Sequence, residues 1–132
     1  MKKTFRLCAL FVTVFWNRFE HTLDNPFPRF LLFAPLPLIA PLGGSPNSQH
    51  MSGHAVDIEL AGVDNFSLAR WIMENLVFDQ LVLEFYVSGQ PSSGWVHVSF
   101  LDEKEKGLDG KEQNRNQVLT RNADQYCTGL VP

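Results

Sequence analysis

The segment FDQLVLEFYVSGQPSSGWVHVSF, residues 78–100, contains two stretches of alternating apolar residues on either side of a turn-rich stretch. Alternation with a period of two is typical of strands that bury one face. Gly, Pro and Ser in SGQPSSG (88–94) favour a reversal of the chain between the two strands. We therefore expect an antiparallel hairpin. Its apolar face would carry Leu81, Leu83, Phe85, Val87, Val96, Val98 and Phe100.

Upstream of this hairpin, the sequence predicts a further strand and a helix. AVDIEL (55–60) alternates, with Val56, Ile58 and Leu60 on one face. AGVDN (61–65) is a turn that can cap a helix at Asp64 or Asn65. In FSLARWIMENL (66–76), the spacing predicts an amphipathic helix whose apolar face carries Leu68, Ala69, Ile72, Met73 and Leu76.

The remainder of the chain carries weaker patterns. Residues 101–117 are polar and charged and predict a solvated loop or helix, and 117–131 predict a last short packed segment. The elements from Gly43 onward predict an α+β fold, a small antiparallel sheet with flanking helices.

The first 42 residues differ from the rest. MKKTFRLCALFVTVFW (1–16) has a basic start and an apolar run, as signal peptides do, but no small-residue cleavage site follows. The run is too short to predict a stable membrane span, and five prolines interrupt the apolar stretch after it. Two interpretations stay open for residues 1–42: an export or membrane-associated segment, or a poorly structured and non-native extension. Residues 43–132 would form the folded domain.

Bulk composition excludes some classes of function. A length of 132 residues suits one domain, and a net charge of -3 gives no basic surface for nucleic acid. Cys8 and Cys127 lie near opposite ends and form neither a metal-binding knuckle nor a disulfide framework. The oligomeric state cannot be inferred from these features.

The polar faces of the predicted strands bring metal-binding side chains together. Asp57, Glu84 and His97 each lie opposite the apolar face of their strand, so neighbouring strands would present them on one side of a sheet. His50, in the loop before the first strand, can fold over that side. Two imidazoles and a carboxylate are a ligand set of catalytic zinc, with a fourth position open. Chance convergence of histidines and acids is the alternative.

The order of these residues resembles a known family. The pattern S-x-H-x-x-G-x-A-x-D is matched by Ser48, His50, Gly53, Ala55 and Asp57, and GWVHVSF (94–100) follows. From about residue 43 to 130 the chain resembles the zinc D-Ala-D-Ala carboxypeptidases, most of all their short single-domain phage and prophage type. The resemblance implies the fold shared with hedgehog-type domains and a Zn²⁺ ion held by His50, Asp57 and His97. It also implies hydrolysis of peptidoglycan stem peptides by a zinc-activated water, in the cell envelope or periplasm or in association with a phage.

A general base is also required, and the resemblance leaves its place open. Many members of the family carry a glutamate three residues before the last histidine, where this chain has Gly94. Glu84 is the candidate catalytic base, and a glutamate merely paired with a surface cation is the alternative. Ser48 resembles a substrate-binding position. Trp95 and Tyr86 could line a groove or serve only in packing, and we do not expect His54 to be a ligand.

One further departure concerns substrate binding. The family usually carries an arginine in a stretch resembling SGYRSP, where this chain has FAPLPLIAPL (33–42). Loss of that guanidinium would remove a bidentate contact to a carboxylate. The helix and strand that the family places before residue 43 are also not recognisable, so part of the fold could be missing. A non-catalytic zinc-binding module, or an inactive truncated or frameshifted member of the family, is therefore the alternative to an enzyme.

Overall fold

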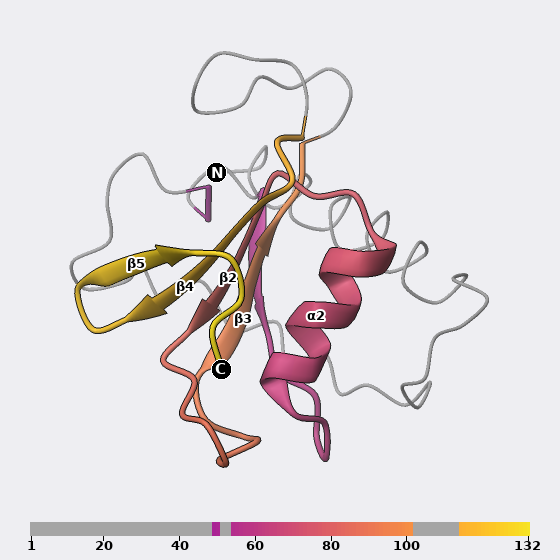
Figure 1. The fold of residues 1–132 in the computed structure, drawn as a ribbon. Coiled ribbons are helices and arrows are strands. Elements are labelled where there is room, and N and C mark those ends of the chain that lie inside the picture. The colour runs from indigo at the N-terminus through magenta and orange to yellow at the C-terminus, as the bar shows by residue number, and fades with distance from the viewer. Residues whose placement is uncertain (1–48, 51–53, 102–113) are drawn as a thin grey trace.

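The structure is a computed structural model, and it describes residues 49–50, 54–101 and 114–132. In that part of the chain, five strands form one sheet and a single helix packs on it (Figure 1). The strand order is β1-β3-β2-β4-β5. The elements are β1 (Ala55–Ile58), α2 (Asn65–Asn75), β2 (Gln80–Glu84), β3 (Trp95–Ser99), β4 (Gln117–Asn122) and β5 (Gln125–Thr128).

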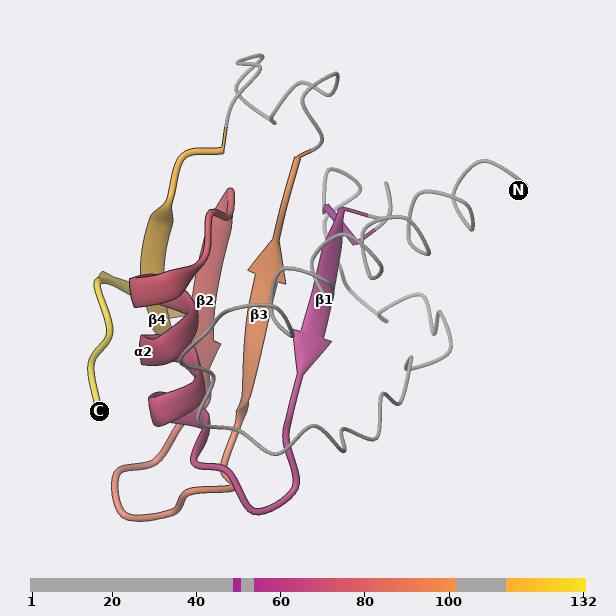
Figure 2. The ribbon, with the colours of Figure 1, turned by 90° about the vertical axis from the view of Figure 1, so that its right-hand side faces the viewer.

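The predicted hairpin is confirmed, but β2 ends at Glu84, and Phe85 and Val87 of the expected apolar face are 37% and 48% exposed. Strands β2 and β3 pair antiparallel, with Val82 opposite His97 and Glu84 opposite Trp95. Strand β1 pairs antiparallel with the other edge of β3, where Asp57 lies opposite His97. The three strands predicted from alternation are thus neighbours in one sheet (Figure 2).

Helix α2 begins where the turn AGVDN ends. The Asp64 side chain is the N-cap and accepts hydrogen bonds from the backbone N–H of Ser67, at 2.9 Å, and from its hydroxyl, at 2.7 Å. These bonds satisfy a helix-terminal N–H that has no partner within the helix. Leu68, Ala69 and Ile72 are buried as predicted, whereas Met73 is 38% exposed and Trp71 is buried in its place.

The C-terminal part of the sheet corrects the expected architecture. Strand β4 pairs parallel with β2 and antiparallel with β5, so the sheet is mixed rather than antiparallel throughout. Parallel pairing requires a long crossover, and the chain between β2 and β4 supplies it by way of β3. Among the described residues α2 is one helix where flanking helices were expected, and it is not long and apolar enough to span a membrane.

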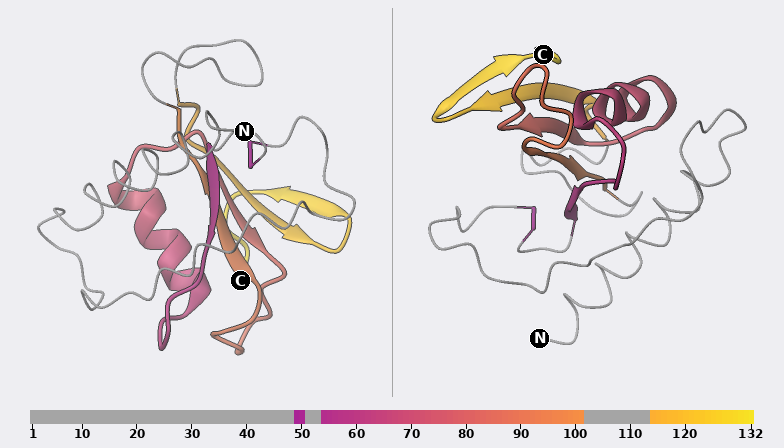
Figure 3. Two further views of the ribbon diagram at one scale, coloured as in Figure 1. Left: turned by 180° about the vertical axis from the view of Figure 1, so that it is seen from behind. Right: turned by 90° about the horizontal axis from the view of Figure 1, so that it is seen from below.

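The two faces of the sheet have different roles. The apolar side chains of β2 and β3 pack against α2 and form the core, with Leu68, Ile72, Phe78, Leu81, Leu83, Val96 and Val98 almost completely buried. Residues 49–50 lie on the other side of the sheet from α2, as the views in Figures 1 and 3 agree. The proposed boundary between residues 1–42 and 43–132 lies outside the described residues and stays a prediction.

Candidate metal centre

Two of the predicted ligands are fixed by strand pairing. Asp57 of β1 and His97 of β3 are direct partners in the antiparallel register, and direct partners point to the same face of a sheet. The Asp57 Oδ1 atom lies 3.1 Å from His97 Nδ1. His97 is only 8% exposed, so its ring is well shielded from water on this face of the sheet, which we call the metal face.

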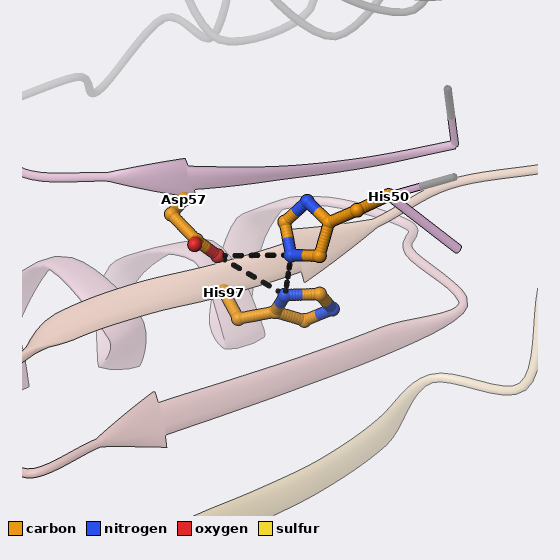
Figure 4. A group of neighbouring side chains, drawn as sticks. All are labelled: His50, Asp57 and His97. Carbon is orange, nitrogen blue, oxygen red and sulfur yellow. Dashed lines mark hydrogen bonds and ion pairs between the residues drawn. The ribbon is translucent and has the colours of Figure 1, made fainter. Parts of the chain in front are cut away.

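The third predicted ligand comes from the turn that precedes β1. His50 Nε2 lies 2.9 Å from His97 Nδ1 and 3.3 Å from Asp57 Oδ1 (Figure 4). The two rings meet edge to face, with centroids 4.6 Å apart. The turn is closed by a hydrogen bond from the His54 N–H to the Gln49 carbonyl, at 2.9 Å. The structure therefore brings together the three side chains that the sequence singled out.

The hydrogen bonds between Asp57 and the two histidines favour the charged forms of Asp57 and His50. The Asp57 hydrogen bond raises the pKa of His50 above its usual value, against the opposing effect of burial, and the charges of Asp57 and Glu84 add to the increase. Burial alone would raise the pKa of Asp57, but hydrogen bonds from His50 and His97 outweigh it and hold that pKa far below its usual range. Asp57 is therefore ionised at neutral pH, as a metal ligand must be.

The arrangement fits a small tetrahedral cation. The three ligand atoms lie within 4.8 Å of one another, and their closest separations are 2.9, 3.1 and 3.3 Å. A tetrahedral zinc ion with bonds of about 2.0–2.1 Å would separate its ligand atoms by about 3.3 Å. Two imidazole nitrogens and one carboxylate oxygen are also a donor set that zinc accepts. His50, Asp57 and His97 thus form a candidate metal-binding group.

Glu84 lies on the same face, diagonal to His97. It pairs with Trp95 in the register, two residues from His97 along β3, and its charge contributes to the raised pKa of His50. Its Oε2 atom accepts a hydrogen bond from Arg121 Nη1 at 3.1 Å. The predicted face is confirmed, but the carboxylate is also paired with a cation, as the alternative interpretation anticipated.

The comparison with known families agrees with this geometry. Residues 40–99 match the family model described as Peptidase M15, the D-Ala-D-Ala carboxypeptidase-like family. This segment is a Peptidase M15 domain. It includes all three residues of the candidate metal group and Glu84. No curated protein and no solved structure matches the chain.

In this Peptidase M15 domain, glycine stands at position 94 in place of the glutamate of many members, and the replacement has a steric cause. Gly94 has a φ of 64°, and a Cβ atom there would collide with the Glu84 carbonyl oxygen and come within 2.6 Å of the Phe85 carbonyl carbon. The left-handed backbone and this close approach both favour glycine. A glutamate at position 94 is therefore incompatible with the hairpin as it is built here.

Other residues considered from the sequence have different outcomes. Ser48, the predicted substrate-binding residue, lies outside the described residues and stays a prediction. Within the described part, the candidate metal group consists of His50, Asp57 and His97 and does not include His54. Tyr86 donates its hydroxyl hydrogen to Asp64 Oδ1 at 2.8 Å, so its observed contact is with the helix cap. Trp95 lies on the metal face and packs against Phe85, with ring centroids 5.2 Å apart.

The polar contacts that surround the ligands were not predicted from the sequence. Gln49 donates a hydrogen bond to the buried carboxylate of Asp79, which in turn pairs with Arg115. Arg121 was likewise not connected with Glu84. The signal that could have predicted the Asp79–Arg115 pair was the position of Asp79 at the start of a strongly apolar strand. A carboxylate in that setting needs a cationic partner.

Proposed function

We propose that the chain is a zinc metallopeptidase that hydrolyses peptidoglycan stem peptides in the manner of D-Ala-D-Ala carboxypeptidases. The observation that carries the proposal is the convergence of His50, Asp57 and His97 within a Peptidase M15 domain. Membership of this family suggests a peptidase and therefore a peptide substrate.

The proposed ligands are His50, Asp57 and His97, which leave one tetrahedral position open for water or substrate. A zinc ion, when bound, supplies a Lewis acid that polarises the scissile carbonyl and lowers the pKa of water. Asp57 contributes the negative charge of the ligand set. Pairing of β3 with β1 and β2 fixes the backbone of His97, and Asp57 Oδ1 lies 3.1 Å from its Nδ1 atom.

Glu84 is the proposed general base. Its role would be to accept a proton from the attacking water and to pass it to the amine of the leaving D-alanine. Its place on the metal face, diagonal to His97, supports this role. The Arg121 hydrogen bond orients the carboxylate, and Arg121 itself makes cation–π contacts with two aromatic rings.

The same ion pair favours a second candidate function, a non-catalytic zinc-binding module. If the Glu84 carboxylate stays turned toward Arg121, it does not reach a water at the metal group, and the metal group would then serve binding alone. The two candidates differ in a single measurable property, the release of D-alanine by protein that contains zinc.

The test compares zinc content and hydrolysis of a D-Ala-D-Ala stem peptide in the wild type, His97→Ala and Glu84→Gln. We expect about one zinc ion per wild-type chain, loss of zinc in His97→Ala, and retained zinc in Glu84→Gln with hydrolysis reduced by roughly 10²–10⁴-fold. Glu74→Gln is a matched control, because Glu74 pairs with Arg70 on the exposed side of α2, away from the metal group.

Each contrary result has a distinct meaning. A folded wild-type protein without zinc would overturn the metal site and the enzyme together. A protein that binds zinc and releases no D-alanine would support the binding module, and equal activity of Glu84→Gln and wild type would remove Glu84 from its proposed role.

A further inference from the structure

A fully buried carboxylate binds the side chain of Gln49, the residue before His50, and has no part in the proposed reaction. Asp79 directly precedes β2 and is 0% exposed. Arg115 binds both of its oxygens: Nε lies 2.7 Å from Oδ1 and Nη2 lies 2.7 Å from Oδ2. Such a bidentate guanidinium pair is both strong and geometrically specific.

The backbone around Asp79 is fixed as well. Its N–H donates to the Ser99 carbonyl at 2.8 Å, and its own carbonyl accepts from the Gln117 N–H at 3.0 Å. Burial alone would raise the pKa of Asp79, but the hydrogen bonds from Arg115 and Gln49 prevail and hold that pKa below its usual value. Asp79 is therefore an immobile, ionised acceptor at the junction of β2, β3 and β4.

Gln49 donates a hydrogen bond to the Asp79 carboxylate. Its Nε2 atom donates to Asp79 Oδ2 at 2.6 Å, and the Gln49 side chain is only 5% exposed. The Gln49 carbonyl accepts the His54 N–H at 2.9 Å, and the His54 carbonyl accepts the Phe100 N–H at 3.0 Å. Gln49 is thus anchored through its side chain to Asp79, just before β2, and through its backbone to His54, which is itself bound to Phe100 just after β3.

This anchoring matters because His50 follows Gln49 directly and belongs to no strand. Asp57 and His97 are held by the ladder of the sheet, whereas the backbone of His50 is placed by the turn before β1, and its ring has a further hydrogen bond with the Ala55 backbone. A ligand on a turn loses more conformational freedom on binding metal than a ligand on a strand, unless the turn is already ordered.

We propose that Gln49 is a positioning residue for His50, held in place by the buried Asp79–Arg115 pair, and that it sets the affinity of the site for zinc. The inference rests on the proposed zinc site but extends it to residues that never touch the ion. Groups that orient metal ligands in this way typically change metal affinity by roughly 10–100-fold when they are removed.

The test measures the zinc affinity of Gln49→Met by competition with a chromophoric chelator. Methionine keeps the length and packing of the side chain but cannot donate to Asp79. We expect zinc affinity to fall by roughly tenfold or more. Gln80→Met is the matched control, because Gln80 also donates one side-chain hydrogen bond, to Gln117 at 2.8 Å, and is next to Asp79 in sequence. Its zinc affinity should equal that of the wild type.

A second measurement separates positioning from a general loss of structure. In a His50→Ala background the remaining ligands bind zinc weakly, and Gln49→Met should cause no further loss there, since its effect passes through His50. A further loss in that background, or unchanged affinity in Gln49→Met alone, would overturn the inference. A wild-type chain that binds no zinc would overturn the proposed function and this inference with it, whereas zinc binding that is insensitive to Gln49→Met would overturn only the inference.

Discussion

At the scale of single residues, Arg121 decides what Glu84 can do. Its guanidinium carbon lies 5.3 Å from the centroid of the Phe85 ring and 5.3 Å from that of Tyr126. Cation–π contacts of this kind favour one position of the guanidinium, whose Nη1 atom lies 3.1 Å from Glu84 Oε2. This hydrogen bond draws the Glu84 carboxylate toward Arg121 on the metal face of the sheet.

This arrangement makes a prediction for Arg121→Gln. Because the variant removes the hydrogen bond that orients Glu84, hydrolysis of the stem peptide should fall roughly tenfold or more while zinc affinity is unchanged. The comparison is with Arg70→Gln, which breaks the exposed Arg70–Glu74 pair of α2 and should leave the rate at the wild-type value. An increase in rate in Arg121→Gln would show instead that the arginine blocks the carboxylate.

At the scale of elements, the β2–β3 hairpin is tied closely to the start of α2. The buried side chain of Asn65 donates to the carbonyls of Ser93, at 3.2 Å, and Gly94, at 3.0 Å. Phe85, which follows β2, adopts a φ of 56°, an uncommon value for a residue with a side chain. The backbone of the hairpin is thus bent sharply at the point where Glu84 leaves the strand, and Gly94 occupies the inside of that bend.

We predict that Gly94→Ala destabilises the protein by at least about 3 kcal/mol, the combined cost of a left-handed alanine and of a collision with backbone atoms. Gly89→Ala is the control, since its φ of 81° is similar and an added Cβ would meet nothing within 4 Å. The free energy of unfolding of Gly89→Ala should fall by only about 1–2 kcal/mol, the cost of placing an alanine in the left-handed conformation. Urea unfolding of both variants measures the difference, and equal losses would contradict the close packing inside the bend.

At the scale of the whole molecule, the predictable half of the fold is the half that packs on α2. Strands β1, β2 and β3 and the helix each turn one apolar face to the core, so their core residues repeat with the period of the element. The ligand group could be predicted for the same reason, because alternation assigns Asp57 and His97 to the opposite face.

Strands β4 and β5 could not be predicted, because their buried and exposed positions do not follow an alternation of apolar and polar residues. All four residues of β5 are exposed, and the fully buried position of β4 is a polar one, Thr120, whose hydroxyl donates to the Gly129 carbonyl at 2.8 Å. Parallel pairing of β4 with β2 leaves no local signal either, because it depends on contacts between residues far apart in the chain. The Asp79 contacts with Gln49 and Arg115 have the same long-range character.

The Asp79–Arg115 pair also makes stability depend on pH. The pKa of Asp79 is lowered in the folded protein. The contribution of its carboxylate to the free energy of unfolding is therefore fully present above about pH 4 and is lost as pH falls through the folded pKa. At pH 7, Asp79→Asn should lower the free energy of unfolding of the metal-free protein by about 3 kcal/mol.

The difference between the wild type and Asp79→Asn should narrow steadily below pH 4, as measured by urea unfolding at a series of pH values. Asp124→Asn, in the exposed turn between β4 and β5, should match the wild type throughout. A gap that stays constant down to pH 2 would show that the carboxylate charge of Asp79 contributes nothing to folding.

The order of strands in the sheet has a consequence for the nascent chain on the ribosome. His50 and Asp57 are synthesised early, but their partner His97 lies on β3, and β1 has no neighbour until β3 has left the exit tunnel. The residue that secures Asp79, Arg115, emerges later still. Because chains emerge from the amino end, the candidate ligand group stays incomplete until β3 has emerged. A metal ion held by all three side chains can therefore be bound only after β3 has left the tunnel.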